Sequence, residues 1–242
     1  MATSLIWISG ASSGIGLALA RAVPWPDARV IGISRRPPPD LEHLAADLGE
    51  PSSWDVVGAA FRRELAAAPL DRVAFVHAAG TIEPIGFAGE VDAGAYAANV
   101  VLNSAAPQAL GQLFLAAVRH LSARKHLVLL TSGAASSVYE GWSSYGAGKA
   151  AVDQWVRNAG AEQARRGGAQ VLAVAPGTVD TGMQAQIRDS TPAEFPQREK
   201  FLDLHRDGRL TAPDDVARRI WALIDGDLET GSVVDLRQLS PP

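Results

Sequence analysis

The stretch Leu5-Ile-Trp-Ile-Ser9, continued by Gly10-Ala-Ser-Ser-Gly14-Ile-Gly16, decides the fold of this chain. Its apolar first part predicts a short buried strand. The residues after Gly16 are strong helix formers up to Pro24, which predicts a helix that ends there. Glycines between the two let the backbone turn tightly and approach a diphosphate, and the helix start offers free N–H groups to its charge. The stretch therefore predicts a strand, a phosphate-binding turn and a helix.

The spacing of the three glycines is G-x-x-x-G-x-G, whereas the commoner dinucleotide fingerprint is G-x-G-x-x-G. Ser12 and Ser13 add hydroxyl donors within the loop. A glycine-rich turn can also be merely a turn, so the loop has to be interpreted together with the rest of the chain.

Further strands are predicted from apolar runs at residues 29–34, 73–77, 126–131, 170–174 and 232–236, with alanine-rich helical patterns between them. This alternation predicts right-handed crossovers and an α/β fold: one Rossmann-like, doubly wound parallel sheet with helices on both faces. Pro37-Pro38-Pro39 follows the second strand and leaves little room for a crossover helix before a strand near Leu44. An extended turn there would leave the adenine side of a cofactor site open.

Composition agrees with one domain over residues 1–242. Hydrophobic residues make up 47% of the chain, the net charge is −4, and cysteine is absent. We therefore expect a sizeable core, no nucleic-acid partner and no disulfide framework. The first apolar run lacks the preceding basic residues of a signal peptide, and no apolar run approaches the length of a membrane span. These features predict a soluble, cytoplasmic protein without a membrane partner.

A second motif, Tyr145-Gly-Ala-Gly-Lys149, carries chemistry. Residues four apart on a helix share a face, so the lysine ammonium can lie beside the phenol and lower its pKa. Ser132 follows the apolar run at residues 126–131, and it is expected at the carboxyl end of that strand, where open α/β sheets bind ligands. A carbonyl held between Ser132 and Tyr145 would be polarised for hydride attack. A tyrosine and lysine at this spacing are commonly a surface pair, but the glycine loop and the serine favour a catalytic site.

Together these motifs resemble the short-chain dehydrogenase/reductase family over essentially the whole chain. The resemblance implies a nicotinamide cofactor, no metal, and a catalytic tetrad. We assign the tetrad to Asn99, Ser132, Tyr145 and Lys149, with Asn103, one helical turn later, as the alternative to Asn99.

The resemblance also implies which residues contact the cofactor. They are Gly10, Ser12, Ser13, Gly14, Ile15, Gly16, Arg35, Arg36, Asp47, Leu48, Ala78, Ala79, Gly80, Tyr145, Lys149, Pro176, Gly177, Val179 and Thr181. Asp55 competes with Asp47 for the place beside the adenine ring.

At two places this chain differs from the pattern that is common in the family. Arg35 and Arg36 stand where NAD-specific relatives have an acid, and an arginine there can grip a 2′-phosphate, which predicts NADPH. His77-Ala-Ala-Gly80 replaces the family's Asn-Asn-Ala-Gly. His77 is interpreted as a packed histidine rather than a catalytic base, because the tetrad already supplies an acid.

The stretches 131–137, 141–142 and 179–188 resemble more narrowly the bacterial sepiapterin reductase and benzil reductase branch. That likeness implies an NADPH-dependent carbonyl reductase acting on ketone or diketone substrates. Ser132, Trp142, Met183 and Asp235 are the candidate substrate-binding residues. Asp235 is predicted either to bind the guanidine-like edge of a pterin or to cap and salt-bridge near Arg237. Residues 181–210 are polar and interrupted by prolines, and we expect them to form either a substrate lid or an ordinary surface helix pair.

Two other functions remain open at this point. A 3-oxoacyl thioester reductase would need a basic patch for its acidic carrier, for which Arg188, Arg198 and Lys200 are candidates. A non-catalytic NADP-sensing regulator would be expected to lack a tetrad residue, and none is missing. The long alanine-rich helices bearing Asn99 and Tyr145 predict a homodimer, with a tetramer as the alternative.

Overall fold

The computed structural model describes residues 3–66 and 69–239, and these build one seven-stranded, wholly parallel sheet. The strand order is β3-β2-β1-β4-β5-β6-β7, so the chain winds outward in both directions from β1. This is the predicted doubly wound α/β fold. The strands are β1 (Ser4–Ser9), β2 (Ala28–Ser34), β3 (Glu42–Ala45), β4 (Arg72–His77), β5 (Arg124–Leu130), β6 (Gln170–Ala175) and β7 (Val233–Asp235).

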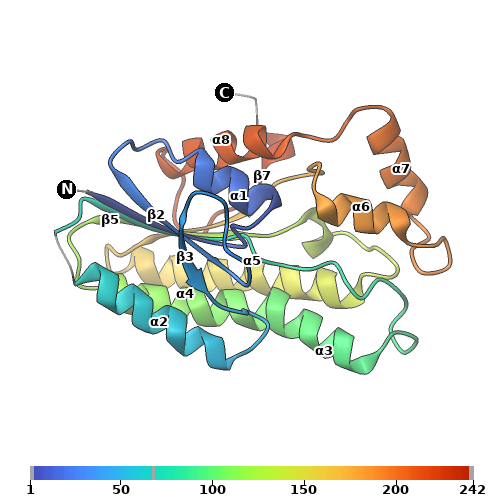
Figure 1. The fold of residues 1–242 in the computed structure, drawn as a ribbon, viewed down its shortest axis with the longest axis horizontal. Coiled ribbons are helices and arrows are strands. Elements are labelled where there is room, and N and C mark those ends of the chain that lie inside the picture. The colour runs from blue at the N-terminus through green and yellow to red at the C-terminus, as the bar shows by residue number, and fades with distance from the viewer. Residues whose placement is uncertain (1–2, 67–68, 240–242) are drawn as a thin grey trace.

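Helices cover both faces of the sheet (Figure 1). One layer holds α1 (Gly14–Arg21) and α8 (Pro213–Ile224), and the other holds α2 (Ser52–Leu65), α4 (Ala106–Val118) and α5 (Ser143–Ala164). Because parallel strands are buried on both faces, they are apolar almost throughout, as in β1 and β4, where every residue is buried.

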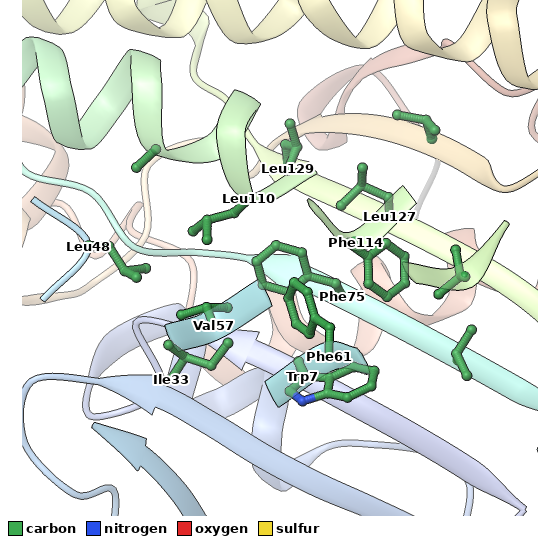
Figure 2. Close-up of a cluster of buried hydrophobic side chains, with 14 of the residues drawn as sticks. Trp7, Ile33, Leu48, Val57, Phe61, Phe75, Leu110, Phe114, Leu127 and Leu129 are labelled. Atoms are coloured by element: carbon green, nitrogen blue, oxygen red, sulfur yellow. The ribbon is translucent and has the colours of Figure 1, made fainter. Parts of the chain in front are cut away.

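Two apolar cores lie on the two faces of the sheet. Trp7, Phe61, Phe75 and Phe114 interlock in the larger core (Figure 2), with Trp7 and Phe61 ring centroids 5.0 Å apart in an edge-on arrangement. Edge-on aromatic pairs add stability beyond the burial of their area. Together the two cores fix the strand ends, and thereby the residues that follow them.

The connection from β2 to β3 is an extended turn, as the three consecutive prolines predicted. It runs from Arg35 to Leu41 without a helix and reverses at Asp40, whose φ is 59°. Proline fixes its own φ and disfavours helix in the residue before it, which explains the missing crossover helix.

Residues Ala93–Val118 form a continuous helical segment that is long and apolar enough to cross a membrane by length and composition alone. The expectation that no apolar run approaches the length of a membrane span did not account for this segment. Leu110, Phe114 and Val118 from this segment lie in the larger core, and α4 packs against α2. The α4 part of this segment thus packs into the core, in the lower layer of helices in Figure 1.

The segment is not uniform: α3 (Ala93–Val100) passes through a π-helical turn, Val101–Ala105, before α4 begins. Such turns insert an extra residue and rotate the side chains that follow.

Beyond β6, two short helices, α6 (Gly182–Asp189) and α7 (Arg198–Arg206), project from one end of the sheet (Figure 1). They occupy most of the segment predicted at residues 181–210. Helix α8 follows with Pro213 at its first position and Asp214 and Asp215 in its first turn, which suits the missing N–H of proline and the helix dipole.

Candidate active site

The glycine loop has a backbone shape that residues with a side chain rarely adopt. Gly10 and Gly14 have φ values of 67° and 53°, in the left-handed region. A Cβ atom at Gly10 would lie 2.9 Å from the Cα of Ala79, and one at Gly16 would overlap the carbonyl oxygen of Gly10. The loop therefore brings the start of α1 close to the end of β4, leaving the helix N-terminus open to an anion.

A cleft of about 830 Å³ opens beside this loop. Most of the predicted cofactor residues line it: Gly10, Ser12, Ser13, Gly14, Ile15, Gly16, Arg35, Arg36, Asp47, Leu48, Ala78, Ala79, Gly80 and Thr181. Asp47 lies on the cleft wall and its competitor Asp55 does not, since Asp55 is in the first turn of α2. The glycine contacts and the size of the cleft fit a dinucleotide with its diphosphate at the start of α1.

Sequence reasoning missed several residues of this cleft. They are Ile33, Ser34, Ala46, Gly49, Glu50, Thr81, Glu83, Ala95, Ala98, Leu102, Gly182 and Gln186. Glu83 and Gln186 face each other across it, and their side chains are joined by a 3.3 Å hydrogen bond. No local motif marks such residues, because they come from loops and helices far apart in the chain.

Ser132 and Tyr145 meet at the carboxyl end of β5. Ser132 directly follows the buried end of the strand, and Tyr145 lies in the first turn of α5. Burial raises the pKa of the Tyr145 phenol above its usual value, while the hydrogen bond between its side chain and that of Ser132 lowers it. The phenol thus stays protonated near neutrality and can donate a proton.

Lys149 lies one turn further along α5 and is buried. Its ammonium donates a 2.9 Å hydrogen bond to the carbonyl oxygen of Leu130 and lies 5.7 Å from the centre of the Tyr145 ring. Burial lowers the pKa of Lys149 to about 8, and the nearby Asp153 carboxylate opposes that shift. Burial of the phenol dominates its pKa in this arrangement, and the expected lowering of that pKa by Lys149 stays a prediction.

The π-helical turn changes which asparagine faces the lysine. Asn103, inside that turn, is fully buried, and its Oδ1 atom and the Lys149 Nζ atom both approach the position that a Cβ of Gly80 would take, at 2.9 and 3.6 Å. Asn103 also bonds to both backbone groups of Thr81. Asn99, the residue assigned from the sequence, lies one turn earlier and donates a 2.6 Å bond to the carbonyl oxygen of Glu83.

The geometry therefore corrects the preference between the two asparagines. Asn103 is the one beside Lys149, and it donates a 3.0 Å bond to the Oδ1 atom of Asn99, which supports it from behind. A register count on a regular helix could not reveal this, because the extra residue of the π turn is invisible in the sequence.

His77 packs under the site, as interpreted from the sequence, and pairs with Ser9. The Ser9 hydroxyl lies 3.0 Å from His77 Nδ1 and accepts bonds from the backbone N–H groups of Ala78 and Ala79. Burial lowers the pKa of His77 to about 3, and the Lys149 charge adds to that effect. The pair fixes the backbone of the loop that leads to Gly80, where the family's asparagine is absent.

The loop after β6 lies beside this centre. Gly177 has a φ of 84°, and Val179 is buried and pairs with Thr211 in an isolated bridge. Pro176, Gly177 and Val179 are not among the residues that line the cleft, whereas Thr181 is. Their predicted contact with the nicotinamide carboxamide thus stays a prediction.

Aromatic side chains close the other side of Tyr145. Trp142 stacks on Phe195 at 4.4 Å and meets Tyr145 edge-on at 5.7 Å. Tyr139 and Phe201 complete this aromatic cluster, which also includes Ile82, Ala134 and Ile187, with Met183 packed against it. Trp142 and Met183, predicted as pocket walls, both lie here, and Met183 also lines the cleft. Phe195 and Phe201 were missed, since neither belongs to a motif.

Asp235 adopts the second of its two predicted roles. It caps the short helical turn that follows β7 by accepting a 2.9 Å bond from the backbone N–H of Arg237, and it binds the Arg237 guanidinium through Nε and Nη2. This pairing holds the pKa of the Asp235 carboxyl below its usual value. Its carboxylate is thus already engaged, and a pterin would have to displace Arg237 to reach it.

No group of three or more histidine, aspartate or glutamate side chains suited to a metal ion is found in residues 3–66 and 69–239.

Comparison with known proteins agrees with this geometry. The family model described as short chain dehydrogenase matches residues 4–192. The chain belongs to the short-chain dehydrogenase family. Membership makes it an oxidoreductase that acts on carbonyl or alcohol groups and uses a nicotinamide cofactor.

The chain is similar to proteins of the branch suggested by the sequence. A benzil reductase ((S)-benzoin forming) of Bacillus subtilis is 32% identical over 237 residues, covering 96% of this chain and 97% of the relative. A sepiapterin reductase of Mus musculus is 34% identical over 112 residues, covering 46% of this chain and 41% of that protein. Among solved structures, a short chain dehydrogenase/reductase of Saccharomyces cerevisiae has a TM-score of 0.82 at 23% identity, covering 96% of this chain and 95% of that one, which shows the shared fold.

Proposed function

We propose that this protein is an NADPH-dependent carbonyl reductase that acts on a ketone or diketone of the benzil or sepiapterin kind. The observation that carries the proposal is the placement of Ser132, Tyr145 and buried Lys149 together at the carboxyl end of β5, next to Gly80 of a cleft whose size and glycine loop fit a dinucleotide. The similarity over nearly the whole length to a benzil reductase supports the substrate class.

Each residue has a defined task in this proposal. NADPH, when bound, supplies the hydride that reduces the carbonyl carbon. Tyr145 donates its proton to the carbonyl oxygen, and Ser132 donates a hydrogen bond that orients it. Lys149 holds a positive charge beside the phenol and the ribose, and Asn103 fixes the backbone at Thr81 and faces the lysine, where a proton can be returned to the site.

The proton donor is tested with Tyr145→Phe, which removes one hydroxyl and keeps the ring. We expect turnover of benzil to fall by about a hundredfold or more, since positioned acid catalysis is typically worth that much. NADPH affinity, measured by fluorescence titration, should change little. Tyr96→Phe is the matched control, because within residues 3–66 and 69–239 its hydroxyl bonds only to the Ser143 side chain, and the variant should retain full activity. A Tyr145→Phe enzyme with more than about a tenth of the wild-type rate would refute the assignment.

Cofactor choice is assigned to Arg35, which is exposed on the cleft wall at the end of β2. A guanidinium there can bind a 2′-phosphate with charge-assisted hydrogen bonds. Wild type should prefer NADPH over NADH, and Arg35→Ala should lose about tenfold or more in affinity for NADPH alone. Arg62→Ala, an exposed arginine on α2, is the control and should leave the ratio unchanged. Equal use of both cofactors by the wild type would overturn the claim.

The carrier-dependent thioester reductase is less well supported. Of the three basic residues that could hold an acidic carrier, Arg198 bonds to the carbonyl oxygen of Arg188 and to Glu199, and Lys200 donates to the Tyr139 hydroxyl. These internal contacts engage the Arg198 and Lys200 side chains instead of presenting them as part of a basic patch. They favour a small carbonyl substrate.

Three further features belong to the proposal. Helices α6 and α7 act as a lid, because Ile187 and Phe201 from them pack against the aromatic cluster over Tyr145.

The enzyme works as a cytoplasmic homodimer that pairs through α4 and α5, which border a groove of about 500 Å³ that includes Leu115 and Trp155. Size-exclusion chromatography with light scattering tests the dimer, and a monomer at micromolar concentration would contradict it.

A further inference from the structure

The carboxyl ends of three neighbouring strands bring Ser132, Gly177 and Arg237 to one edge of the sheet. Strand β6 pairs with β5 on one side and with β7 on the other, and Ala175 lies opposite Asp235 in the register. Ligands of open parallel sheets bind beyond this edge. Arg237, two residues after the end of β7, therefore lies at the same ligand-binding edge of the sheet as Ser132.

The Arg237 side chain lies across two glycines of this edge. A Cβ atom at Gly177 would be 3.1 Å from the Arg237 Cγ, and one at Gly133 would be 2.9 Å from its Nη2. Gly133 is the residue directly after Ser132. The guanidinium thus reaches the catalytic serine's loop through space that exists because neither position carries a side chain.

Asp235 holds the guanidinium in this place. Its carboxylate accepts bonds from Nε at 3.0 and 3.1 Å and from Nη2 at 2.5 Å, while its own position is fixed by the backbone N–H of Arg237. The Arg237 Nη1 atom has no protein partner within residues 3–66 and 69–239. The Arg237 side chain is 55% exposed, so the Nη1 side of its guanidinium is accessible to a ligand.

The ion pair also defines the kind of ligand that suits it. Because Asp235 balances the charge, the pair offers N–H donors without a net positive charge and suits a neutral oxygen acceptor. We propose that Arg237 is a specificity-determining residue that donates a hydrogen bond to the second oxygen of a vicinal dicarbonyl substrate while Ser132 and Tyr145 bind the oxygen of the carbonyl being reduced. This inference rests on the proposed carbonyl reductase activity and names the feature by which the enzyme selects its substrate.

The test compares two substrates that differ in one oxygen. Benzil has two adjacent carbonyl groups, whereas deoxybenzoin keeps both rings and only one carbonyl. The wild type should have the higher kcat/KM on benzil, and Arg237→Met should lower that value by about ten- to a hundredfold, the range for a hydrogen bond to a charged group. On deoxybenzoin the same variant should stay within about threefold of wild type.

Two further variants separate recognition from structure. Asp235→Asn keeps the guanidinium donors and one oxygen that accepts the Arg237 N–H, but it removes the balancing charge, so the preference for benzil should fall by less than in Arg237→Met. Arg218→Met removes an arginine that forms an exposed ion pair with Asp215 on α8. This control should leave kcat/KM unchanged on both substrates. Melting temperature and NADPH affinity show whether each variant is intact.

The outcomes are distinct. Inactivity of the wild type on both substrates would refute the proposed function. An active wild type whose Arg237→Met variant loses both substrates equally, or neither, would refute the role of Arg237 and leave the reductase activity standing.

Discussion

The cofactor half of the site and the substrate half are built from different parts of the chain. Around the glycine loop, the shape comes from backbone, because Cβ atoms at Gly10 and Gly16 would strike Ala79 and Gly10. On the substrate side, the shape comes from side chains: an aromatic cluster centred on Trp142 and an ion pair between Asp235 and Arg237. The first half is defined within a few residues of sequence, and the second requires contacts between distant segments.

This difference separates cofactor binding, which the enzyme shares with its family, from the choice of substrate, which is its own. Side chains such as Phe195 or Arg237 can change without altering the glycine loop, so substrate range can shift while cofactor binding is retained. Three substitutions test how far the two halves are independent.

The largest effect is expected at Gly16→Ala, in the cofactor half. Its Cβ would overlap a backbone oxygen, which cannot move without opening the loop. We expect NADPH affinity to weaken by about a hundredfold and activity on every substrate to fall with it, since overpacking against rigid backbone costs up to about 3 kcal/mol. Gly226→Ala is the matched control. Gly226 follows α8 and is not among the residues that line the cleft, and a Cβ there would make only ordinary van der Waals contacts, so the variant should bind NADPH normally. Normal binding by both variants would show that the loop is less constrained than its geometry indicates.

A smaller effect is expected where the halves meet, at the two asparagines. Asn103→Ala should lower kcat by about tenfold or more with little change in KM, because it removes the amide beside Lys149. Asn99→Ala removes a buried amide of the same size and should cost similar stability, about 1–3 kcal/mol, but less kcat. Steady-state kinetics and thermal unfolding of both variants provide the comparison. A larger loss of kcat in Asn99→Ala would restore Asn99 to the tetrad.

The smallest effect on turnover is expected from Phe195→Leu, in the substrate half. It removes the ring stacked on Trp142 and should raise KM for benzil a few-fold while NADPH affinity stays unchanged. Phe61→Leu removes a ring from the larger core, so it should lower the melting temperature without changing KM. If Phe195→Leu weakens NADPH binding as well, the two halves are coupled through the lid.

Much of the fold was readable from the sequence, for reasons that are local. Buried parallel strands are continuous apolar runs, and β1, β4 and β6 were each predicted within one residue of their observed bounds. Three prolines excluded a helix between β2 and β3. The cofactor loop and the pairing of Tyr145 with Lys149 were equally clear, because both depend on spacings of a few residues.

The rest depends on geometry that spacing does not encode. The π-helical turn at Val101–Ala105 moved the preferred asparagine from Asn99 to Asn103. The pKa of Tyr145 is raised because burial of the phenol outweighs the interaction with the Ser132 side chain that lowers it. For Asp235, the sequence left two roles open, and only the position of Arg237 in space distinguishes between them.

The buried contact between Ser9 and His77 has a consequence for acid resistance. His77 is neutral in the folded protein, with a pKa of about 3, whereas an exposed histidine takes up a proton near pH 6.5. As pH falls below 6.5, the unfolded chain binds this proton and the folded chain does not. The unfolded state therefore gains about 1.4 kcal/mol per pH unit from this residue, until the pH nears 3. The buried Ser9–His77 contact, which holds the loop before Gly80 in place at neutral pH, thus makes the folded protein less stable in mild acid.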